Sequence, residues 1–282
     1  VDHSRNGKYI ATAGTRGREL WIWDAATGRR LRSIDTTGAY VRAVRFGAKN
    51  QLVYSGHADG SIKVWKVADG KLVSTLTGHT SAVSDISINK AGTTIATSAW
   101  DGTVRTWSVS SGKTVRVIQA HTRPVTSVVF GADGSTLATS SNIGEMALWN
   151  AANGTVIKKW RAHNEAVTQL AASSDGKFIA SAGWDRTIKL WNPKTGAAIR
   201  TLSGHSSIVR GVAFSPNNNW LASSSLDQTT RIWRVTDGVE LQRFQARPLY
   251  LGRVSWSQDN RTVASGSGDR TVDVWNVAAG SA

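Results

Sequence analysis

Short runs of alternating apolar and polar residues, separated by glycine-containing turns, dominate the chain. The run Val83–Ile88 alternates in this way and ends at a turn signal, Asn89–Gly92. Three further short runs follow it, at Thr94–Ser98, Thr103–Ser108 and Thr114–Ile118. Because every connection is only a few residues long, the pattern predicts four antiparallel strands that form one meander.

Key residues of this unit recur every 42 residues. Tryptophan keeps the interval at Trp23, Trp65, Trp107, Trp149, Trp191, Trp233 and Trp275. A glycine follows each of them by five residues, at Gly28, Gly70, Gly112, Gly154, Gly196, Gly238 and Gly280. The interval also holds for His79, His121, His163 and His205, and for Asp59, Asp101, Asp185, Asp227 and Asp269. One structural unit is therefore repeated seven times.

A single four-stranded sheet of this size cannot bury both of its faces. Sheets stacked side by side cover one another, and seven of them can close radially so that few strand edges stay exposed. Residues 1–282 are therefore expected to form one array, although their number exceeds the usual length of a single domain.

The residues Gly78-His79, Thr97, Asp101 and Trp107, with their counterparts in the other units, are similar to the WD40 repeat. The resemblance covers essentially the whole chain. It implies an all-β fold, a seven-bladed β-propeller of four-stranded antiparallel blades. Strand A of each blade would line the central channel, and strand D would lie outermost.

The resemblance also implies a hydrogen-bonded network in each blade, which would stiffen the blade because its buried polar groups satisfy one another. The complete sets are His79, Thr97, Asp101 and Trp107; His163, Ser181, Asp185 and Trp191; and His205, Ser223, Asp227 and Trp233. The other four blades lack a member. Ile143 stands where the Asp partner of His121 is expected, Thr37 and Arg247 stand at His positions, and blade 1 has no Asp. We expect these four blades to be looser than blades 3, 5 and 6.

The two ends of the array do not match. Only Ser281 and Ala282 follow Gly280, so the last blade lacks strand D, and Val1-Asp2-His3 resembles only the end of a strand A. WD40 propellers commonly borrow a missing outer strand from upstream of the first blade. We expect residues preceding Val1, in a longer native protein, to supply it; a three-stranded last blade is the alternative.

In the WD40 architecture, the loops before strand A and the turns between strands B and C gather at one channel entrance, the top face, where peptides often bind. Large apolar residues that the fold does not require precede the turn Asp at Trp100, Trp184 and Leu226. Basic and aromatic residues of the adjoining loops are Arg42, Arg210, Arg123, Tyr40 and Tyr250. Exposed aromatic residues concentrate binding energy, so these eight residues are the candidate partner site. The alternative is that Trp100 and Trp184 only cover neighbouring loops.

Candidate chemistry is sparse. The periodic His residues fall on different blades, and His3 and His57 show no ligand spacing. Most Asp residues fall in turns, and the remaining acids, Asp85, Glu145 and Glu165, form no recurring pair. We therefore expect no catalytic residues, no metal site and no cofactor.

The chain has 34 Lys plus Arg against 19 Asp plus Glu, a net charge of +15. This excess favours acidic proteins, nucleic acid or anionic lipid as partners; a basic surface without a partner is the alternative. There is no Cys, which excludes disulfides and thiolate metal sites. No apolar run approaches the roughly 20 residues of a membrane span, and no signal-peptide pattern opens the chain. We expect a cytoplasmic location.

Together these features predict a rigid, non-catalytic scaffold or sensor domain that binds an acidic peptide or partner protein on the top face. Family analogy alone adds an effector domain upstream in the same chain. The alternative function is binding of nucleic acid or another polyanion through the basic surface, with aromatic residues as stacking platforms.

Overall fold

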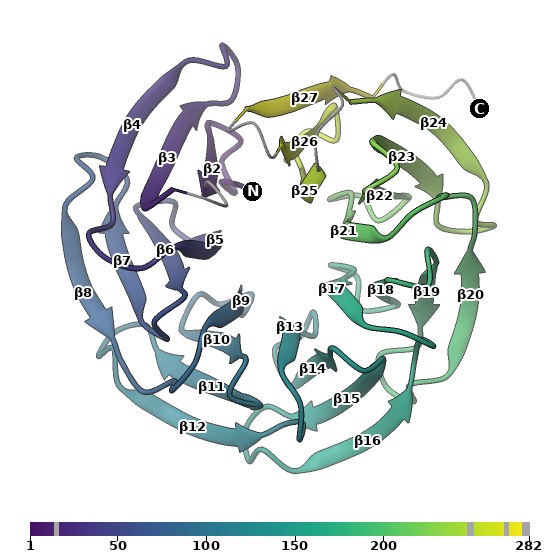
Figure 1. The fold of residues 1–282 in the computed structure, drawn as a ribbon, viewed down its shortest axis with the longest axis horizontal. Helices are drawn as coiled ribbons and strands as arrows, with labels where there is room; N and C mark the ends of the chain where they lie inside the picture. Colours follow the sequence, from purple (N-terminus) through teal and green to yellow (C-terminus); the bar gives the residue numbers. More distant parts are fainter. Residues whose placement is uncertain (14–16, 247–250, 268–270, 278–282) are drawn as a thin grey trace.

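The computed structural model describes residues 1–13, 17–246, 251–267 and 271–277. Arg247, Tyr250, Asp269 and Gly280, which the sequence analysis singled out, lie outside these ranges. The strands form seven antiparallel sheets, or blades, arranged in a ring around a central channel (Figure 1). The described residues contain no helix, and so none that could cross a membrane. The predicted all-β, seven-bladed propeller is therefore confirmed.

Strands that are consecutive in sequence are neighbours in each sheet, and the first strand is innermost. Blade 1 consists of β1 (Asp2–His3), β2 (Tyr9–Ala13), β3 (Glu19–Asp24) and β4 (Arg30–Asp35). Blade 2 consists of β5 (Val41–Phe46), β6 (Leu52–His57), β7 (Ile62–Lys66) and β8 (Leu72–Leu76). Blade 3 consists of β9 (Val83–Ile88), β10 (Thr94–Ala99), β11 (Thr103–Ser108) and β12 (Thr114–Gln119).

The next three blades repeat this order. Blade 4 consists of β13 (Val125–Phe130), β14 (Thr136–Ser141), β15 (Glu145–Asn150) and β16 (Val156–Arg161). Blade 5 consists of β17 (Val167–Ala172), β18 (Ile179–Gly183), β19 (Ile188–Trp191) and β20 (Ala198–Leu202). Blade 6 consists of β21 (Val209–Phe214), β22 (Trp220–Ser225), β23 (Thr229–Arg234) and β24 (Glu240–Gln245).

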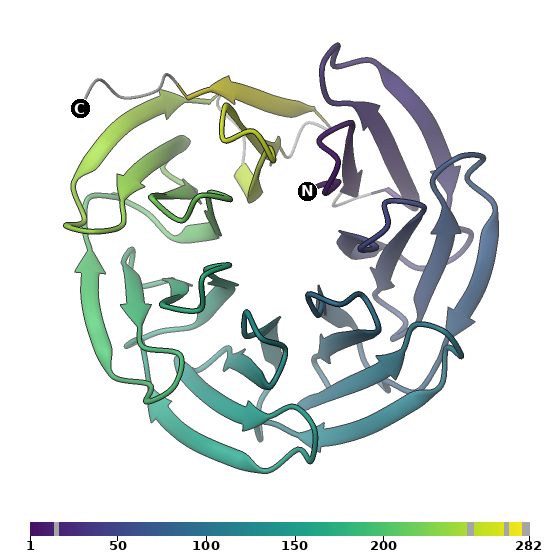
Figure 2. The same ribbon diagram turned by 180° about the vertical axis from the view of Figure 1, so that it is seen from behind.

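Blade 7 has three strands in the described part of the chain, β25 (Leu251–Trp256), β26 (Thr262–Ser267) and β27 (Val272–Asn276). It closes the ring against blade 1, where His3 Nδ1 lies 2.7 Å from Ser255 Oγ. The two blades that close the ring meet beside the N-terminus when the propeller is seen from the opposite face (Figure 2). Donation of a fourth strand by residues upstream of Val1 stays a prediction.

The hydrophobic core lies between blades rather than at the centre of the ring. Six clusters each join two successive blades, from blades 1 and 2 to blades 6 and 7. In the first, Leu20 and Ile22 of blade 1 cluster with Phe46, Val53 and Trp65 of blade 2. Blades 2 to 6 thus bury both faces against their neighbours, as the stacking argument requires, and blades 1 and 7 each bury one face in this way.

Each of the six C–D strand pairs contains a register shift of one residue at the repeated tryptophan. In blade 3, Thr106 faces Arg116 whereas Trp107 faces Thr114, so Val115 is the extra residue of a β-bulge. The same shift occurs in blades 1, 2, 4, 5 and 6. The residue after each bulge therefore occupies an equivalent place on every outer strand.

Candidate functional site

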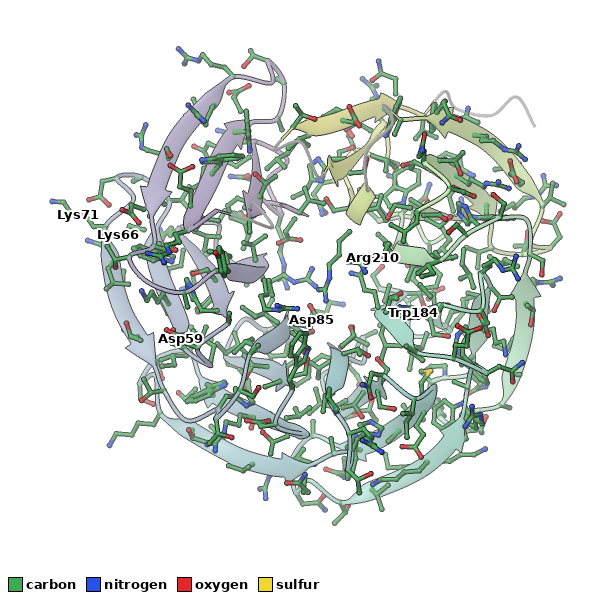
Figure 3. All side chains as sticks on the ribbon, in the orientation of Figure 1. Asp59, Lys66, Lys71, Asp85, Trp184 and Arg210 are labelled. Atoms are coloured by element: carbon green, nitrogen blue, oxygen red, sulfur yellow. The ribbon has the colours of Figure 1, made fainter. Side chains whose placement is uncertain are left out.

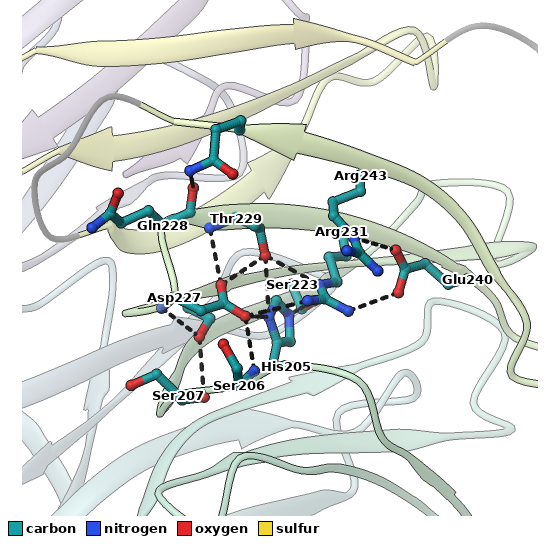
Figure 4. A network of polar contacts seen from close by, with 12 residues as sticks. His205, Ser206, Ser207, Ser223, Asp227, Gln228, Thr229, Arg231, Glu240 and Arg243 are labelled. Carbon is teal, nitrogen blue, oxygen red and sulfur yellow. Dashed lines mark hydrogen bonds and ion pairs between the residues drawn. The ribbon is translucent and has the colours of Figure 1, made fainter.

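The three complete networks have the predicted connectivity. In blade 6, the Trp233 indole N–H donates to Ser223 Oγ at 2.8 Å, and Ser223 Oγ lies 2.7 Å from His205 Nε2. His205 Nδ1 lies 2.8 Å from Asp227, which also accepts from the backbone N–H of Ser206 (Figure 4). Blades 3 and 5 repeat the series through His79, Thr97, Asp101 and Trp107, and through His163, Ser181, Asp185 and Trp191.

A neutral imidazole fits the contacts of His205. The Ser223 hydroxyl can accept from Trp233 and donate to His205 Nε2 while the ring proton on Nδ1 faces Asp227. Burial lowers the pKa of His205 and outweighs the opposing effect of Asp227. Burial alone would raise the pKa of Asp227, but hydrogen bonds from His205 and Thr229 hold it below its usual range.

Four networks lack a member of the family set, and in blades 2 and 4 other side chains take the missing place, so these two networks are not broken. The greater looseness expected of these blades stays a prediction. In blade 4, His121 Nε2 lies 2.9 Å from Thr139 Oγ1, and Glu145 replaces the missing Asp at 3.4 Å from His121 Nδ1. In blade 2, His57 Nε2 lies 2.8 Å from Ser55 Oγ, which accepts from the indole of Trp65.

A positional signal for both substitutes was present in the sequence. His57 follows Ser55 by two residues on one strand, so the two side chains share a face. Glu145 occupies the position of Thr187 in blade 5, where the Thr hydroxyl donates to the network carboxylate of Asp185. In blades 1 and 7 the indole contact persists, from Trp23 to Thr12 at 2.8 Å and from Trp275 to Ser265 at 3.4 Å. The indole hydrogen bond is therefore present in all seven blades.

The top face carries the exposed aromatic side chains that the sequence predicted. Trp100 and Trp184 are each 45% exposed and Tyr40 is 49% exposed. The Arg42 guanidinium lies over the Trp100 ring, 4.0 Å from its centroid. Arg123 is exposed, Leu226 is half-buried, and Tyr250 lies outside the described residues.

A channel of about 1110 Å³ runs through the ring, and five arginines line it: Arg5, Arg42, Arg45, Arg210 and Arg253. Three of them, Arg42, Arg210 and Arg253, lie among the first three residues of an innermost strand. Of the other candidate residues, Leu226 also lines the channel, whereas Trp100, Trp184, Tyr40 and Arg123 lie outside its wall. Figure 3 shows Arg210 and Asp85 at the channel, and Lys66 and Lys71 at the outer rim. The structure therefore brings Arg42, Arg210 and Leu226 to one cavity and sets Trp100 beside it through Arg42.

Only one of these three arginines forms an ion pair in the described part of the chain. Arg253 reaches from blade 7 to blade 3, where it contacts the Asp85 carboxylate and donates to Ser84 O at 3.0 Å. Asp85 is 2% exposed and also accepts from Ser127. Arg210 is open to the channel, yet the surrounding protein, and then the charges of Arg253 and Arg42, lower its pKa. Among the described residues, the channel mouth thus holds two positive charges without an acidic partner.

Sequence reasoning missed the Arg253–Asp85 pair and grouped Asp85 with the spare acids. A signal existed, because the two residues are 168 positions apart, a whole number of repeats. They therefore occupy the same register position on the innermost strands of blades 7 and 3. Among the described residues, no group of three His, Asp or Glu side chains could hold a metal ion.

The repeat pattern was compared with known proteins. A family model, "WD domain, G-beta repeat", matches residues 28–66, 70–108, 112–149, 154–192, 196–234 and 241–276. The first five segments begin at the repeated glycine, cross strand D of one blade and continue through strands A to C of the next. No curated protein matches the chain. Since the six matched segments cover most of the sequence and follow the observed blades, this chain belongs to the WD40 repeat family.

Proposed function

We propose that this propeller is a scaffold or sensor domain that binds an acidic peptide segment or partner protein across the top mouth of its channel. WD40 propellers generally act as protein-interaction scaffolds and are typically non-catalytic. The observation that supports this site is the pair Arg42 and Arg210, which line the channel without an ion-pair partner in the described residues. A cytoplasmic location and an upstream effector domain belong to the same proposal, the latter by family analogy alone.

The chemistry of the mouth favours a carboxylate-bearing ligand. Carboxylates would form charge-assisted hydrogen bonds with Arg42 and Arg210 and relieve their mutual repulsion with Arg253. Trp100 and Leu226 would contact an apolar side chain next to the acidic group, since exposed aromatic residues contribute much of the energy of interfaces. Trp184, Tyr40 and Arg123 would extend the contact around the rim.

The test is binding of a fluorescent array of Glu- and Asp-rich peptides, each with one Leu or Phe, at about 150 mM salt. We expect R42Q/R210Q and W100A/W184A each to weaken the best peptide by about tenfold or more, with unchanged melting temperatures. K66Q/K71Q is the matched control, because it removes the same charge from the outer rim. Equal weakening by the control and R42Q/R210Q would contradict a site at the mouth.

Polyanion binding through the whole basic surface is the second candidate, and the net charge of +15 favours it. It predicts that single-stranded DNA binds without sequence preference and that affinity collapses between about 50 and 200 mM salt. Under this alternative the two double variants, R42Q/R210Q and K66Q/K71Q, would lose affinity equally. A peptide that still binds at the higher salt would favour the top-face site.

A further inference from the structure

Outer strands in this propeller hold the next blade through a basic side chain. At four junctions, the residue after the C–D bulge donates to carbonyl oxygens of the C–D turn in the following blade. The contacts are Arg32 to Ala68 at 2.7 Å, Arg116 to Ala152 at 2.6 Å, Lys158 to Thr195 at 2.8 Å and Arg200 to Asp237 at 2.8 Å. The turn carbonyls thus accept hydrogen bonds from a basic side chain of the preceding blade. We call this side chain the clasp.

The aliphatic stem of the clasp residue packs on the repeated turn glycine. A Cβ added to Gly154 would lie 2.6 Å from Arg116 Cδ, and one added to Gly238 would lie 2.7 Å from Arg200 Cδ. At Gly196 the corresponding distance to Lys158 Cδ is 3.1 Å. At these three junctions the clasp therefore fills the space over the turn as well as satisfying its carbonyls.

The junction between blades 2 and 3 lacks this residue. Ser74 stands at the clasp position of β8, and the only atom within 4 Å of a Cβ added to Gly112 belongs to Leu76. In the described part of the chain, no side chain donates to the carbonyls of Ser110 or Ser111. Of the five junctions described on both sides, this is the one without a clasp.

A cavity of about 220 Å³ occupies the vacated space, and we call it the β8 groove. Its apolar wall includes Val73, Leu76 and Val109, and its polar lip includes Ser110 and Ser111. On the outer face of β8, Leu72 and Val73 are 50% and 49% exposed. Figure 1 shows β8 as the outermost strand of blade 2, so the groove opens at the perimeter of the ring.

We propose that the β8 groove binds an arginine or lysine side chain of a partner protein, on a surface separate from the top face. The aliphatic stem would pack against Val73, Leu76 and Val109, and the cation would donate to the carbonyls of Ser110 and Ser111. The four occupied junctions are the template, since the same type of turn accepts the same type of side chain there.

The probe is the tripeptide acetyl-Ile-Arg-Thr-amide, which copies residues 199–201 around the blade 5 clasp. Its binding is followed by NMR of ¹³C-labelled Val and Leu methyl groups, among which those of Val73, Leu76 and Val109 report on the groove. We expect saturable shifts of these methyl groups at peptide concentrations on the order of 1 mM. The citrulline analogue, which has the same shape without the charge, should bind at least about tenfold more weakly.

Filling the groove from within should abolish binding. Ser74→Arg restores the clasp, so we expect it to eliminate the methyl shifts and to raise the melting temperature. Ser74→Lys, which copies the Lys158 clasp, gives a second variant should the first fail to fold. Thr75→Arg adds the same charge at the next position and should leave peptide binding intact.

The proposal is overturned if the citrulline peptide binds equally well, or if the shifts persist in a folded Ser74→Arg or Ser74→Lys protein. It is also overturned if the peptide shifts only the methyl groups of Leu226, because that result would move the contact to the channel mouth. Loss of peptide binding in Thr75→Arg would show an effect of charge rather than of the groove.

Discussion

At the scale of single residues, burial favours the neutral form of three histidines, since it lowers the pKa of His79, His121 and His205. Ser223 can donate to His205 Nε2 only while that nitrogen carries no proton, and its second contact is taken by the Trp233 indole. With a proton on Nε2, the hydroxyl would accept from both the ring and the indole, and its own hydrogen would lose His205 as an acceptor. Asp227 favours the charged ring, but burial and the nearby Arg231 oppose it.

Acid should destabilise the protein in two steps. Burial lowers the pKa of His79, His121 and His205 below 6.5, so the unfolded chain binds more protons than the native one and stability falls as pH drops below about 6.5. The lowered pKa values of Asp185 and Asp227 add a second loss below about pH 4. Urea unfolding between pH 8 and 3 measures both steps. A constant free energy of unfolding from pH 7 to 5 would contradict the neutral ring.

Alanine substitutions should show that the consensus acid Asp227 contributes more to stability than Glu145, which replaces that acid in blade 4. The Asp227 side chain is 4% exposed and pairs with His205 and Arg231, so Asp227→Ala should cost about 3 kcal/mol or more. The Glu145 side chain is 44% exposed and lies 3.4 Å from His121, so Glu145→Ala should cost less than about 1 kcal/mol. Chemical denaturation of both variants gives the comparison. Equal costs would show that Glu145 is a full equivalent.

Spacing in the sequence located the networks of blades 3, 5 and 6 because their members keep the 42-residue interval. It failed for His57 and Glu145 because neither stands at its consensus position. Glu145 lies two residues after Ile143, and His57 lies on β6 rather than at the position of Thr37. Whether a longer side chain reaches the same point depends on strand geometry, which spacing alone does not contain. The rim residues were found by the same reasoning, but their relation to the channel required the structure.

At the scale of elements, turns between strands do more than reverse the chain. Gly144, in the turn between β14 and β15, has φ +87 and faces the loop that precedes β17. A methyl carbon there would overlap the carbonyl oxygen of His163 and lie 2.7 Å from that of Glu165. The repeated glycines of these turns therefore serve contact between blade elements as well as backbone conformation.

Alanine substitution of two glycines in blade 4 should destabilise the protein by different amounts, because only one of them has that contact. Gly134 has φ +75, and the atom nearest to an added Cβ is Asn89 Cβ at 3.6 Å. Gly134→Ala should therefore lower the free energy of unfolding by about 1–2 kcal/mol, from the backbone conformation alone. Gly144→Ala should cost about 1–3 kcal/mol more, because rigid backbone occupies the space. Thermal or urea unfolding measures the difference. Equal destabilisation would mean that the loop before β17 yields freely.

At the scale of the whole molecule, the fold was predictable because one repeated unit specifies its own neighbours. Each blade needs a second blade on either side to bury its faces, and hydrophobic clusters meet that need at the six junctions from blades 1 and 2 to blades 6 and 7. The Arg253–Asp85 pair was not predictable in this way, since it joins blades 7 and 3 across the channel. Reasoning one repeat at a time treats each blade locally and contains no information about contacts across the ring.

Hydrogen exchange should show that the backbone amides of blades 2 and 4 are protected as strongly as those of blades 3, 5 and 6. Their networks are completed by His57 and Glu145, so amides of β6 and β14 should be protected like those of β10, β18 and β22. This differs from the expectation of four looser blades, which the sequence alone suggested. Markedly faster exchange in β6 and β14 would restore that first expectation.

The uneven exposure of tryptophan has an optical consequence. Of the thirteen indoles, only Trp100 and Trp184 are strongly exposed, while Trp107 and Trp233 are at most 2% exposed. A collisional quencher such as acrylamide should therefore extinguish a small, separate part of the intrinsic fluorescence. Iodide should quench this part of the fluorescence more strongly than neutral acrylamide does, because the positive potential around Arg42 and Arg210 concentrates anions there. The protein thus carries a built-in optical reporter of whatever covers its channel mouth.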